Sequence, residues 1–190
     1  MSSILYLASG SARRKEILSR LGISYTVVVA DVDESIFPGE SPMELVVRLG
    51  LKKAQALQGK FNDGFALGAD TTVEFNGESF GKPLDDEDAF SMLMKFSDAV
   101  VRIHTGHALV NLKTQQFYQK MSTSEVHFKK LDPQAIRDYV KTGEPKDKAG
   151  SFAIQGLGGV FIESTSGSYS NIMGLDEDIV KNWYSTYINA

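Results

Sequence analysis

Cysteine is absent from this chain of 190 residues, which excludes disulfide bonds and thiolate metal ligands. Long apolar runs are absent too, since no stretch approaches the ~18 residues that a membrane-spanning helix needs. Residues 1–4 lack the basic start and the long apolar core of a signal peptide. Together these absences predict a cytoplasmic protein without a membrane among its partners.

An excess of positive charge is also missing. The chain has 20 Lys and Arg residues against 24 Asp and Glu residues, which gives a net charge of −4 at pH 7. Proteins that bind nucleic acid through bulk attraction carry a basic surface, so no nucleic-acid partner is expected. Any anionic ligand must therefore be held by a local cluster of cations.

The chain does contain a regular alternation of strand and helix patterns, without repeats, linkers or low-complexity tracts. This alternation predicts an α/β protein with a mixed twisted sheet and flanking helices. The length fits a single domain over residues 1–190. The expected strands are 4–8, 24–30, 65–75, 100–111 and 117–129, and the expected helices are 12–21, 42–57, 86–97, 133–141 and 175–188.

The first predicted strand leads directly into residues 9–14, Ser-Gly-Ser-Ala-Arg-Arg. A helix that begins here leaves backbone N–H groups pointing outward, and such an N-terminus attracts anions. Arg13 and Arg14 add charged donors that suit phosphate oxygens. The pattern favours a phosphate site, while Ser11 as an ordinary N-cap followed by two solvated arginines is the alternative.

Asp70 and Lys53 are charged residues in apolar surroundings. Asp70 lies near the end of an apolar strand, where a carboxylate is costly unless it is paired, hydrogen-bonded or bound to metal. Lys53 falls inside the apolar arc of its helix, ~20° from Val46 at ~100° per residue. Both are candidate ligand-binding residues. The alternatives are an aspartate that caps a turn and a lysine whose stem covers apolar surface.

Two further candidates are the acidic run 31–34, Asp-Val-Asp-Glu, and Lys82, which stands between Gly81 and Pro83. Hard cations such as Mg²⁺ prefer carboxylate oxygens and keep waters and substrate phosphates as other ligands. A solvated acidic loop is the commoner meaning of such a run. Lys82 follows a hairpin that returns toward Asp70, and its flanking residues fix the backbone.

The histidines and glycines indicate no other site. His104, His107 and His127 lie in β-rich segments without metal-ligand spacing. The opening loop matches neither G-x-x-x-x-G-K-[ST] nor G-x-G-x-x-G, which excludes a P-loop and a dinucleotide fingerprint. No Ser–His–Asp arrangement is indicated.

Six short motifs follow one another along the chain: LASGSARR at 7–14, DVDE at 31–34, KA at 53–54, GADT at 68–71, GKP at 81–83 and AGSFAIQG at 149–156. In this order they resemble the motifs of the Maf family of nucleoside triphosphate pyrophosphatases. The resemblance implies a two-lobed, Maf/ITPase-like fold around a nucleotide-binding cleft, often in a homodimer. It also implies hydrolysis between the α- and β-phosphates, with Mg²⁺ or Mn²⁺ as the cofactor.

The resemblance also implies roles for individual residues. Asp70 matches the catalytic acidic residue that accepts a proton from the attacking water, and Glu34 matches an acidic position that assists the metal or the water. Because a carboxylate is a weak base in water, we expect Asp70 to orient a metal-bound water or to ligate the metal together with Glu34. The phosphate-binding positions correspond to Ser9, Arg13, Arg14, Lys53 and Lys82, of which Lys53 and Lys82 are also expected to act in catalysis.

Three positions separate the subfamilies of this family, and they read Arg13, Thr71 and Gln155 here. The combination resembles the dTTP/UTP pyrophosphatases, whereas the 7-methyl-GTP branch carries Gln and Glu at the second and third positions. The amide of Gln155 offers a donor and an acceptor, which matches the mixed edge of thymine or uracil. The predicted substrates are therefore dTTP and UTP, including modified pyrimidine nucleotides.

Two residues depart from the family pattern without changing a charged site residue. Ala12 stands where proline is usual at the first helical position, and Asp176 replaces a frequent proline before the last helix.

Two alternatives stay open: the same reaction on another base such as 7-methyl-GTP, and a non-catalytic nucleotide-binding regulator of cell division. Asp70 favours the enzyme, because binding a triphosphate requires no water-orienting carboxylate.

Overall fold

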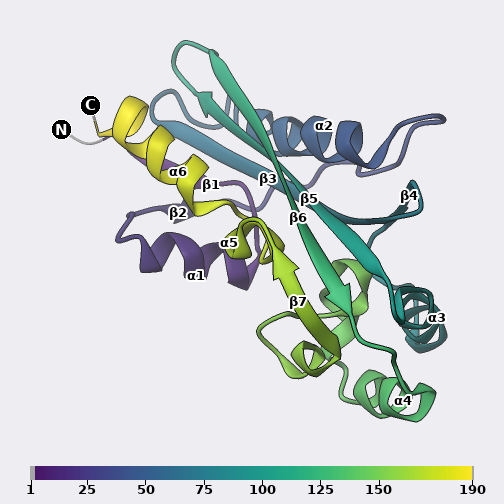
Figure 1. Ribbon diagram of the computed structural model, residues 1–190. Coiled ribbons are helices and arrows are strands. Elements are labelled where there is room, and N and C mark those ends of the chain that lie inside the picture. The colour runs from purple at the N-terminus through teal and green to yellow at the C-terminus, as the bar shows by residue number, and fades with distance from the viewer. Residues whose placement is uncertain (1–2, 190) are drawn as a thin grey trace.

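The computed structural model describes residues 3–189, and its centre is a seven-stranded mixed sheet (Figure 1). The strands are β1 (Leu5–Leu7), β2 (Thr26–Val27), β3 (Phe65–Phe75), β4 (Glu78–Phe80), β5 (Val100–Asn111), β6 (Phe117–Phe128) and β7 (Ile162–Ser166). Six of them follow the order β2-β1-β3-β5-β6-β7, and β4 pairs with β3 off this path. β1 is parallel to β2 and β3, and the other pairs are antiparallel. The predicted fold class is confirmed.

Helices cover both faces of this sheet (Figure 1). They are α1 (Ala12–Arg20), α2 (Pro42–Gln55), α3 (Asp86–Phe96), α4 (Pro133–Lys141), α5 (Tyr169–Ile172) and α6 (Glu177–Trp183). Short 3₁₀ turns occupy 144–147, 149–151 and 157–161. Among the helices within residues 3–189, none has the length and apolar character needed to cross a membrane.

The side-chain alternation of the strands separates the core into clusters. Leu7 and Leu67 face α1 and α6, whereas Tyr6 and Ala66 face α2. A third cluster lies between α3, α4 and the far ends of β3, β5 and β6. Since successive residues of a strand point to opposite faces, neighbouring polar residues of β3 can serve opposite sides of the sheet.

Glycines let α2 approach the sheet at backbone contact distance. A Cβ added to Gly68 of β3 would lie 2.2 Å from the carbonyl oxygen of Gly50 in α2, and one added to Gly106 of β5 would lie 2.1 Å from Val46 O. Only residues without a side chain fit these positions. The close approach holds Lys53, which is three residues beyond Gly50, directly against β3.

Most predicted helices agree with the structure to within two residues, because their caps are local. Ser41 forms the expected capping box with Glu44, and Asp176 caps the last helix. That helix is α-helical only to Trp183 and continues as a π-helical turn over 184–188, where the sequence predicted one helix over 175–188.

Two strand predictions were wrong. The strand predicted over 24–30 contains only the two residues of β2, because its partner β1 ends at Leu7 and offers nothing to pair with further on. The glycine-rich segment 150–163 leads into β7, which was not predicted. β7 is an exposed edge strand, so it lacks the apolar alternation by which strands are recognised.

One edge of β3 is interrupted between its two partners. β1 pairs with β3 as far as Leu67, and β4 pairs with it from Val73 onward. Between these pairings, the stretch 68–72 has no strand neighbour on that edge within the described part of the chain. The loop after β1 therefore ends beside polar positions of β3 that have no strand partner on this edge.

Candidate active site

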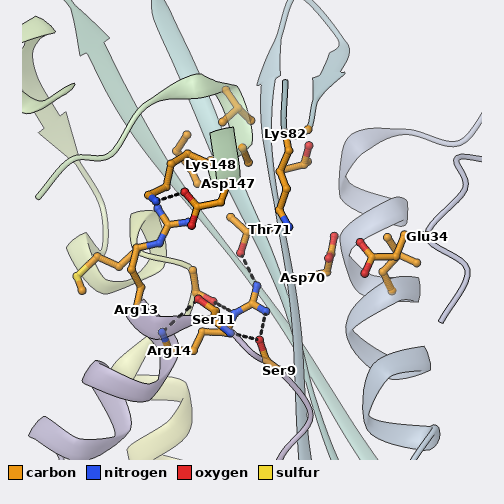
Figure 2. Close-up of a pocket in the computed structure, with 18 of the residues that line it drawn as sticks. Ser9, Ser11, Arg13, Arg14, Glu34, Asp70, Thr71, Lys82, Asp147 and Lys148 are labelled. Atoms are coloured by element: carbon orange, nitrogen blue, oxygen red, sulfur yellow. Dashed lines mark hydrogen bonds and ion pairs between the residues drawn. The ribbon is translucent and has the colours of Figure 1, made fainter. Parts of the chain in front are cut away.

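A pocket of about 790 Å³ opens at this gap in the sheet edge. Eight of the nine site residues predicted from the sequence line it, and Gln155 does not. Five cationic and three anionic side chains line the pocket, so its lining has a formal net charge of +2, although the net charge of the whole chain is −4. The polar lining residues are Ser9, Ser11, Arg13, Arg14, Glu34, Lys53, Asp70, Thr71, Thr72, Ser79, Lys82, Asp147 and Lys148. All of them except Lys53, Thr72 and Ser79 are labelled in Figure 2.

The loop after β1 turns into α1 at the floor of the pocket. Ser11 caps α1 by accepting the backbone N–H of Arg14 at 3.5 Å, so this part of the alternative holds, whereas Arg14 is buried rather than solvated. Ser9 Oγ accepts the backbone N–H of Ser11 at 3.3 Å and Arg14 Nη1 at 2.9 Å. The first turn of α1 therefore faces the pocket and fixes the guanidinium of Arg14 there.

Arg14 is buried among neutral acceptors. It is 9% exposed, its Nε donates to Gly174 O at 2.8 Å, and its Nη2 donates to Thr71 Oγ1 at 3.2 Å. No carboxylate within residues 3–189 comes within 4.0 Å of its nitrogens. Burial lowers the pKa of Arg14, and the more distant Asp70 opposes this. A buried charge without a counter-ion is costly, so this position favours an anionic ligand.

Lys53 is also buried, but unlike Arg14 it lies between two carboxylates. Its Nζ lies 2.6 Å from Asp70 Oδ1 and 2.9 Å from Glu34 Oε1. Lys53 and Asp70 are each 8% exposed, whereas the Glu34 side chain is 54% exposed. The predicted alternatives, a snorkelling lysine and a turn-capping aspartate, do not fit these contacts. The three residues form one charged cluster that connects α2, β3 and the loop after β2.

Glu34 is the member of the acidic run that reaches the pocket. Its loop is tied to α2, because Lys52 Nζ donates to Asp33 O at 2.7 Å and Arg48 Nη2 donates to Ser35 O at 2.9 Å. Asp33 itself accepts the backbone N–H of Ser35 and does not line the pocket. The run is thus partly a solvated loop and partly a site residue.

Arg13 and Lys82 are the other cations that line the pocket without a carboxylate within 4.0 Å, among residues 3–189. Burial lowers the pKa of Arg13, and the attraction of Asp147 opposes this. Figure 2 shows Asp147 beside Arg13 and paired with Lys148. Lys82 is exposed at the end of β4, where Gly81 O accepts the backbone N–H of Gly150 at 3.0 Å.

Asp147 and Lys148 are pocket residues that the sequence interpretation missed. They lie in a charged run, 146–148, which reads as solvated surface, and only their place directly before the motif at 149–156 could have indicated them. Gln155 is exposed and follows Ile154, which lines the pocket. Its predicted contact with the base stays a prediction.

His104 and His107, which are buried in the sheet, have structural partners. His104 bonds Glu74 Oε2 and Thr123 Oγ1, each at 2.8 Å. His107 Nε2 accepts the backbone N–H of Asp176 at 2.8 Å, and its Nδ1 has no partner among the described residues. Neither histidine lines the pocket.

The pocket carboxylates could contribute ligands to a divalent cation. Within residues 3–189 there is no group of three or more His, Asp or Glu side chains that could enclose a metal ion. Asp70 and Glu34, however, already hold one cationic group, the ammonium of Lys53, between their oxygens. Two carboxylates suit Mg²⁺ when waters and substrate phosphates complete its coordination. The residues therefore fit a metal that arrives with a phosphate ligand.

The fold and the pocket define an α/β protein with a cation-rich pocket at an interrupted sheet edge. The chain belongs to the family of Maf-like proteins, whose family model matches residues 4–183.

Its curated relatives include proteins named dTTP/UTP pyrophosphatase. That of Hahella chejuensis is 43% identical over 174 residues, covering 90% of this chain and 86% of the relative. That of Syntrophomonas wolfei is 40% identical over 169 residues, covering 89% of both. That of Clostridioides difficile is 38% identical over 185 residues, covering 95% of both. Among solved structures, the Staphylococcus aureus Ham1 protein is a distant likeness, with a TM-score of 0.45 and 16% identity over 65% of this chain and 71% of that one.

Proposed function

We propose that this protein is a nucleoside triphosphate pyrophosphatase that hydrolyses dTTP and UTP to the monophosphate and pyrophosphate. The observation that carries the proposal is the buried guanidinium of Arg14, which has only neutral partners in a pocket that also contains Asp70. The names of the curated relatives support the same activity and the same two substrates.

The proposed chemistry follows from the charges in the pocket. Phosphoryl transfer needs positioning and charge neutralisation more than covalent catalysis. Arg13, Arg14 and Lys82 would bind the phosphates through charge-assisted hydrogen bonds. Asp70 would accept a hydrogen bond from the attacking water, while Lys53 keeps its carboxylate in place. The water oxygen would bond to the α-phosphorus as one of its protons passes to Asp70 and then to solvent. The bond from the α-phosphorus to the bridging oxygen breaks, and pyrophosphate leaves with that oxygen.

We also propose Mg²⁺ or Mn²⁺ as the cofactor, held by Asp70 and Glu34 together with phosphate oxygens. A cation bound there neutralises phosphate charge and makes a bound water more acidic. The donor set supports this assignment, since the contacts of Lys53 use Asp70 Oδ1 and Glu34 Oε1 and leave the second oxygen of each carboxylate for a cation beside the ammonium.

The experiment that tests the proposal is hydrolysis of a nucleotide panel with either metal, with pyrophosphate resolved from phosphate. We expect pyrophosphate chiefly from dTTP and UTP. In Asp70→Asn we expect turnover to fall about 10²- to 10⁴-fold, because a neutral amide cannot take a proton from the attacking water. Nucleotide binding should persist, since the cations are unchanged. Exposed Asp138→Asn, outside the pocket, is the matched control.

Each other outcome identifies one of the alternatives. Pyrophosphate released mainly from another base keeps the reaction and overturns the choice of substrate. Tight nucleotide binding without turnover in the unaltered protein identifies the regulator instead. An Asp70→Asn variant with full activity refutes the role of Asp70.

Base selection is proposed to depend on Gln155, together with Arg13 and Thr71. Gln155→Glu replaces a donor with an acceptor, so the pairing with a pyrimidine edge is lost. We expect kcat/KM for dTTP and UTP to fall at least tenfold, about 1.4 kcal/mol. Gln134→Glu, on the exposed surface of α4, is the control. Unchanged rates on both substrates would refute the assignment.

A cytoplasmic location and a homodimer complete the proposal, and both rest on the family resemblance. Light scattering of the purified protein measures the oligomeric state: twice the 20.9 kDa chain mass supports the dimer, and the single mass refutes it.

A further inference from the structure

Arg14 is supported by a chain of hydroxyl groups that leads out of the pocket. Arg14 Nη2 donates to Thr71 Oγ1 at 3.2 Å, Thr71 Oγ1 lies 3.0 Å from Thr105 Oγ1, and Thr105 Oγ1 donates to Asn171 O at 3.2 Å. A guanidinium cannot accept and a carbonyl cannot donate, so the direction is fixed at both ends. Thr71 must donate to Thr105, and it therefore offers Arg14 a lone pair.

The end of this chain is an asparagine that is fully buried. Asn171 is 0% exposed, and its Nδ2 donates to Ile103 O at 3.0 Å and to Ser124 Oγ at 2.9 Å. Its Oδ1 accepts from Ser122 Oγ at 3.0 Å. The Nδ2 and Oδ1 of Asn171 thus both bond to β5 or β6 and fix the residue there. This places the backbone carbonyl of Asn171 against Thr105.

The same residue anchors a second support of Arg14. The segment 171–176 carries Gly174, whose carbonyl accepts Arg14 Nε at 2.8 Å, and its other end is fixed by the bond from Asp176 N to His107 Nε2. Gly174 has φ +102°, and a Cβ there would lie 3.3 Å from Thr71 Oγ1. The segment therefore lies close against the guanidinium and is tied to the sheet on both sides of the contact.

We propose that Thr105 and Asn171 are positioning residues for Arg14. Neither lines the pocket, and both act through the groups that Arg14 touches. They fix the acceptors of Nε and Nη2, and thereby the plane in which the guanidinium meets an anion. This inference rests on the proposed function, since it takes Arg14 as a phosphate ligand.

The test is Thr105→Val, which removes one hydroxyl and keeps the shape of the side chain. Binding of inorganic pyrophosphate with Mg²⁺ is measured by calorimetry, and KM and kcat are measured for dTTP. We expect pyrophosphate to bind about fivefold more weakly and KM to rise by a similar factor, with a smaller change in kcat. Thr123→Val is the matched control: it removes a hydroxyl that bonds His104, which is one residue from Thr105 on the opposite face of the sheet.

A double-mutant cycle distinguishes positioning from general stability. Arg14→Lys keeps the charge and removes the fork that contacts Thr71. If Thr105 acts through Arg14, Thr105→Val should weaken pyrophosphate binding in the wild-type background and not further in Arg14→Lys. Asn171→Asp, which removes the Nδ2 donors, should follow the same pattern, and Thr105→Val keeps the test available if that variant does not fold.

The outcomes are distinguishable. Losses that add in the double variant, or a Thr105→Val protein that is less stable but binds pyrophosphate normally, overturn the inference and leave the proposed function intact. A wild-type protein that neither binds pyrophosphate nor hydrolyses dTTP and UTP overturns the proposed function and this inference with it.

Discussion

Two buried cations face the same pocket from opposite sides of the sheet, and they are compensated differently. Lys53 lies between Asp70 and Glu34, so its charge is balanced before any ligand arrives. Arg14 is held by a hydroxyl on each side and by one carbonyl, so its charge is left for a ligand. β3 makes this possible, because residues 70 and 71 point to opposite faces.

The difference separates two tasks of the site. A buried ion pair stabilises its surroundings only while both partners are present, and Lys53 thus orders a carboxylate suited to orient water. An arginine among neutral oxygens keeps its attraction for phosphate, at a cost in stability before the ligand binds. We infer that catalytic geometry is organised on the α2 side and anion affinity on the α1 side.

The largest expected effect concerns the support of Lys53. In Gly68→Ala, the new Cβ would lie 2.2 Å from Gly50 O and 2.6 Å from Ala54 N, which are backbone atoms of α2. Backbone atoms cannot rotate away, so the helix must move. We expect the free energy of unfolding to fall by about 4 kcal/mol or more, measured by denaturant unfolding.

Two other glycines sharpen this comparison. Gly81→Ala is the control, because a Cβ there meets nothing within 4 Å, and its effect should stay within about 0.5 kcal/mol. Gly174→Ala tests the Arg14 side, where the neighbours are side-chain atoms and the φ of +102° adds strain of about 1–3 kcal/mol. Equal losses at positions 68 and 174 would contradict the view that α2 is the more rigid support.

The second prediction removes each cation in turn. Lys53→Met leaves the buried carboxylate of Asp70 beside Glu34 without a counter-ion, and we expect a loss of about 3 kcal/mol. Arg14→Met removes a charge that had no counter-ion, and this gain offsets part of the cost of the lost hydrogen bonds. We therefore expect a loss of stability of only about 1 kcal/mol. Pyrophosphate binding should fall more than tenfold in Arg14→Met. Chemical denaturation and calorimetry measure the two quantities.

Arg20→Met is the control for this pair of variants. Arg20 bonds Glu177 at 3.0 Å with a half-exposed side chain, and such surface pairs contribute little. Equal stability losses in Lys53→Met and Arg14→Met would refute the distinction between a compensated and an uncompensated cation.

The sequence predicted the side of the site that depends on local patterns. Lys53 stood out because it interrupts an apolar arc, and Asp70 because it interrupts an apolar strand. Ser41, the cap of the helix that carries Lys53, was identified from its neighbours alone. Each of these signals lies within one turn or one strand, where the chemistry of adjacent residues determines the structure.

The supports of these residues could not be predicted in the same way. Arg14 meets Gly174 across 160 positions of the sequence, and Asn171 meets Ile103 across 68. The close packing of α2 depends on glycines from three separate elements, each of which resembles an ordinary glycine in isolation. Such contacts follow from the sheet topology, and no local pattern encodes them.

The smallest expected effect is a loss of stability in acid on the Arg14 side, where His107 holds the end of the segment 171–176. Burial lowers the pKa of His107 to about 4, the attraction of Asp176 opposes this, and the charge of Arg14 adds to it. Between pH 6.5 and 4 the unfolded chain therefore binds a proton that the folded chain does not. Stability must fall as the pH falls through this range, by roughly 1 kcal/mol between pH 7.5 and 5.5.

His107→Gln separates this loss from other titrations, because the Gln carbonyl can still accept the N–H of Asp176 but cannot be protonated. The pH dependence of its unfolding free energy should be shallower than that of the wild type by the same amount. His127→Gln, at a half-exposed histidine on β6, controls for the removal of a histidine as such. Parallel profiles for wild type and His107→Gln would mean that the pKa of His107 is the same in the folded and the unfolded chain, and that the Arg14 support is no more sensitive to acid than the Lys53 cluster.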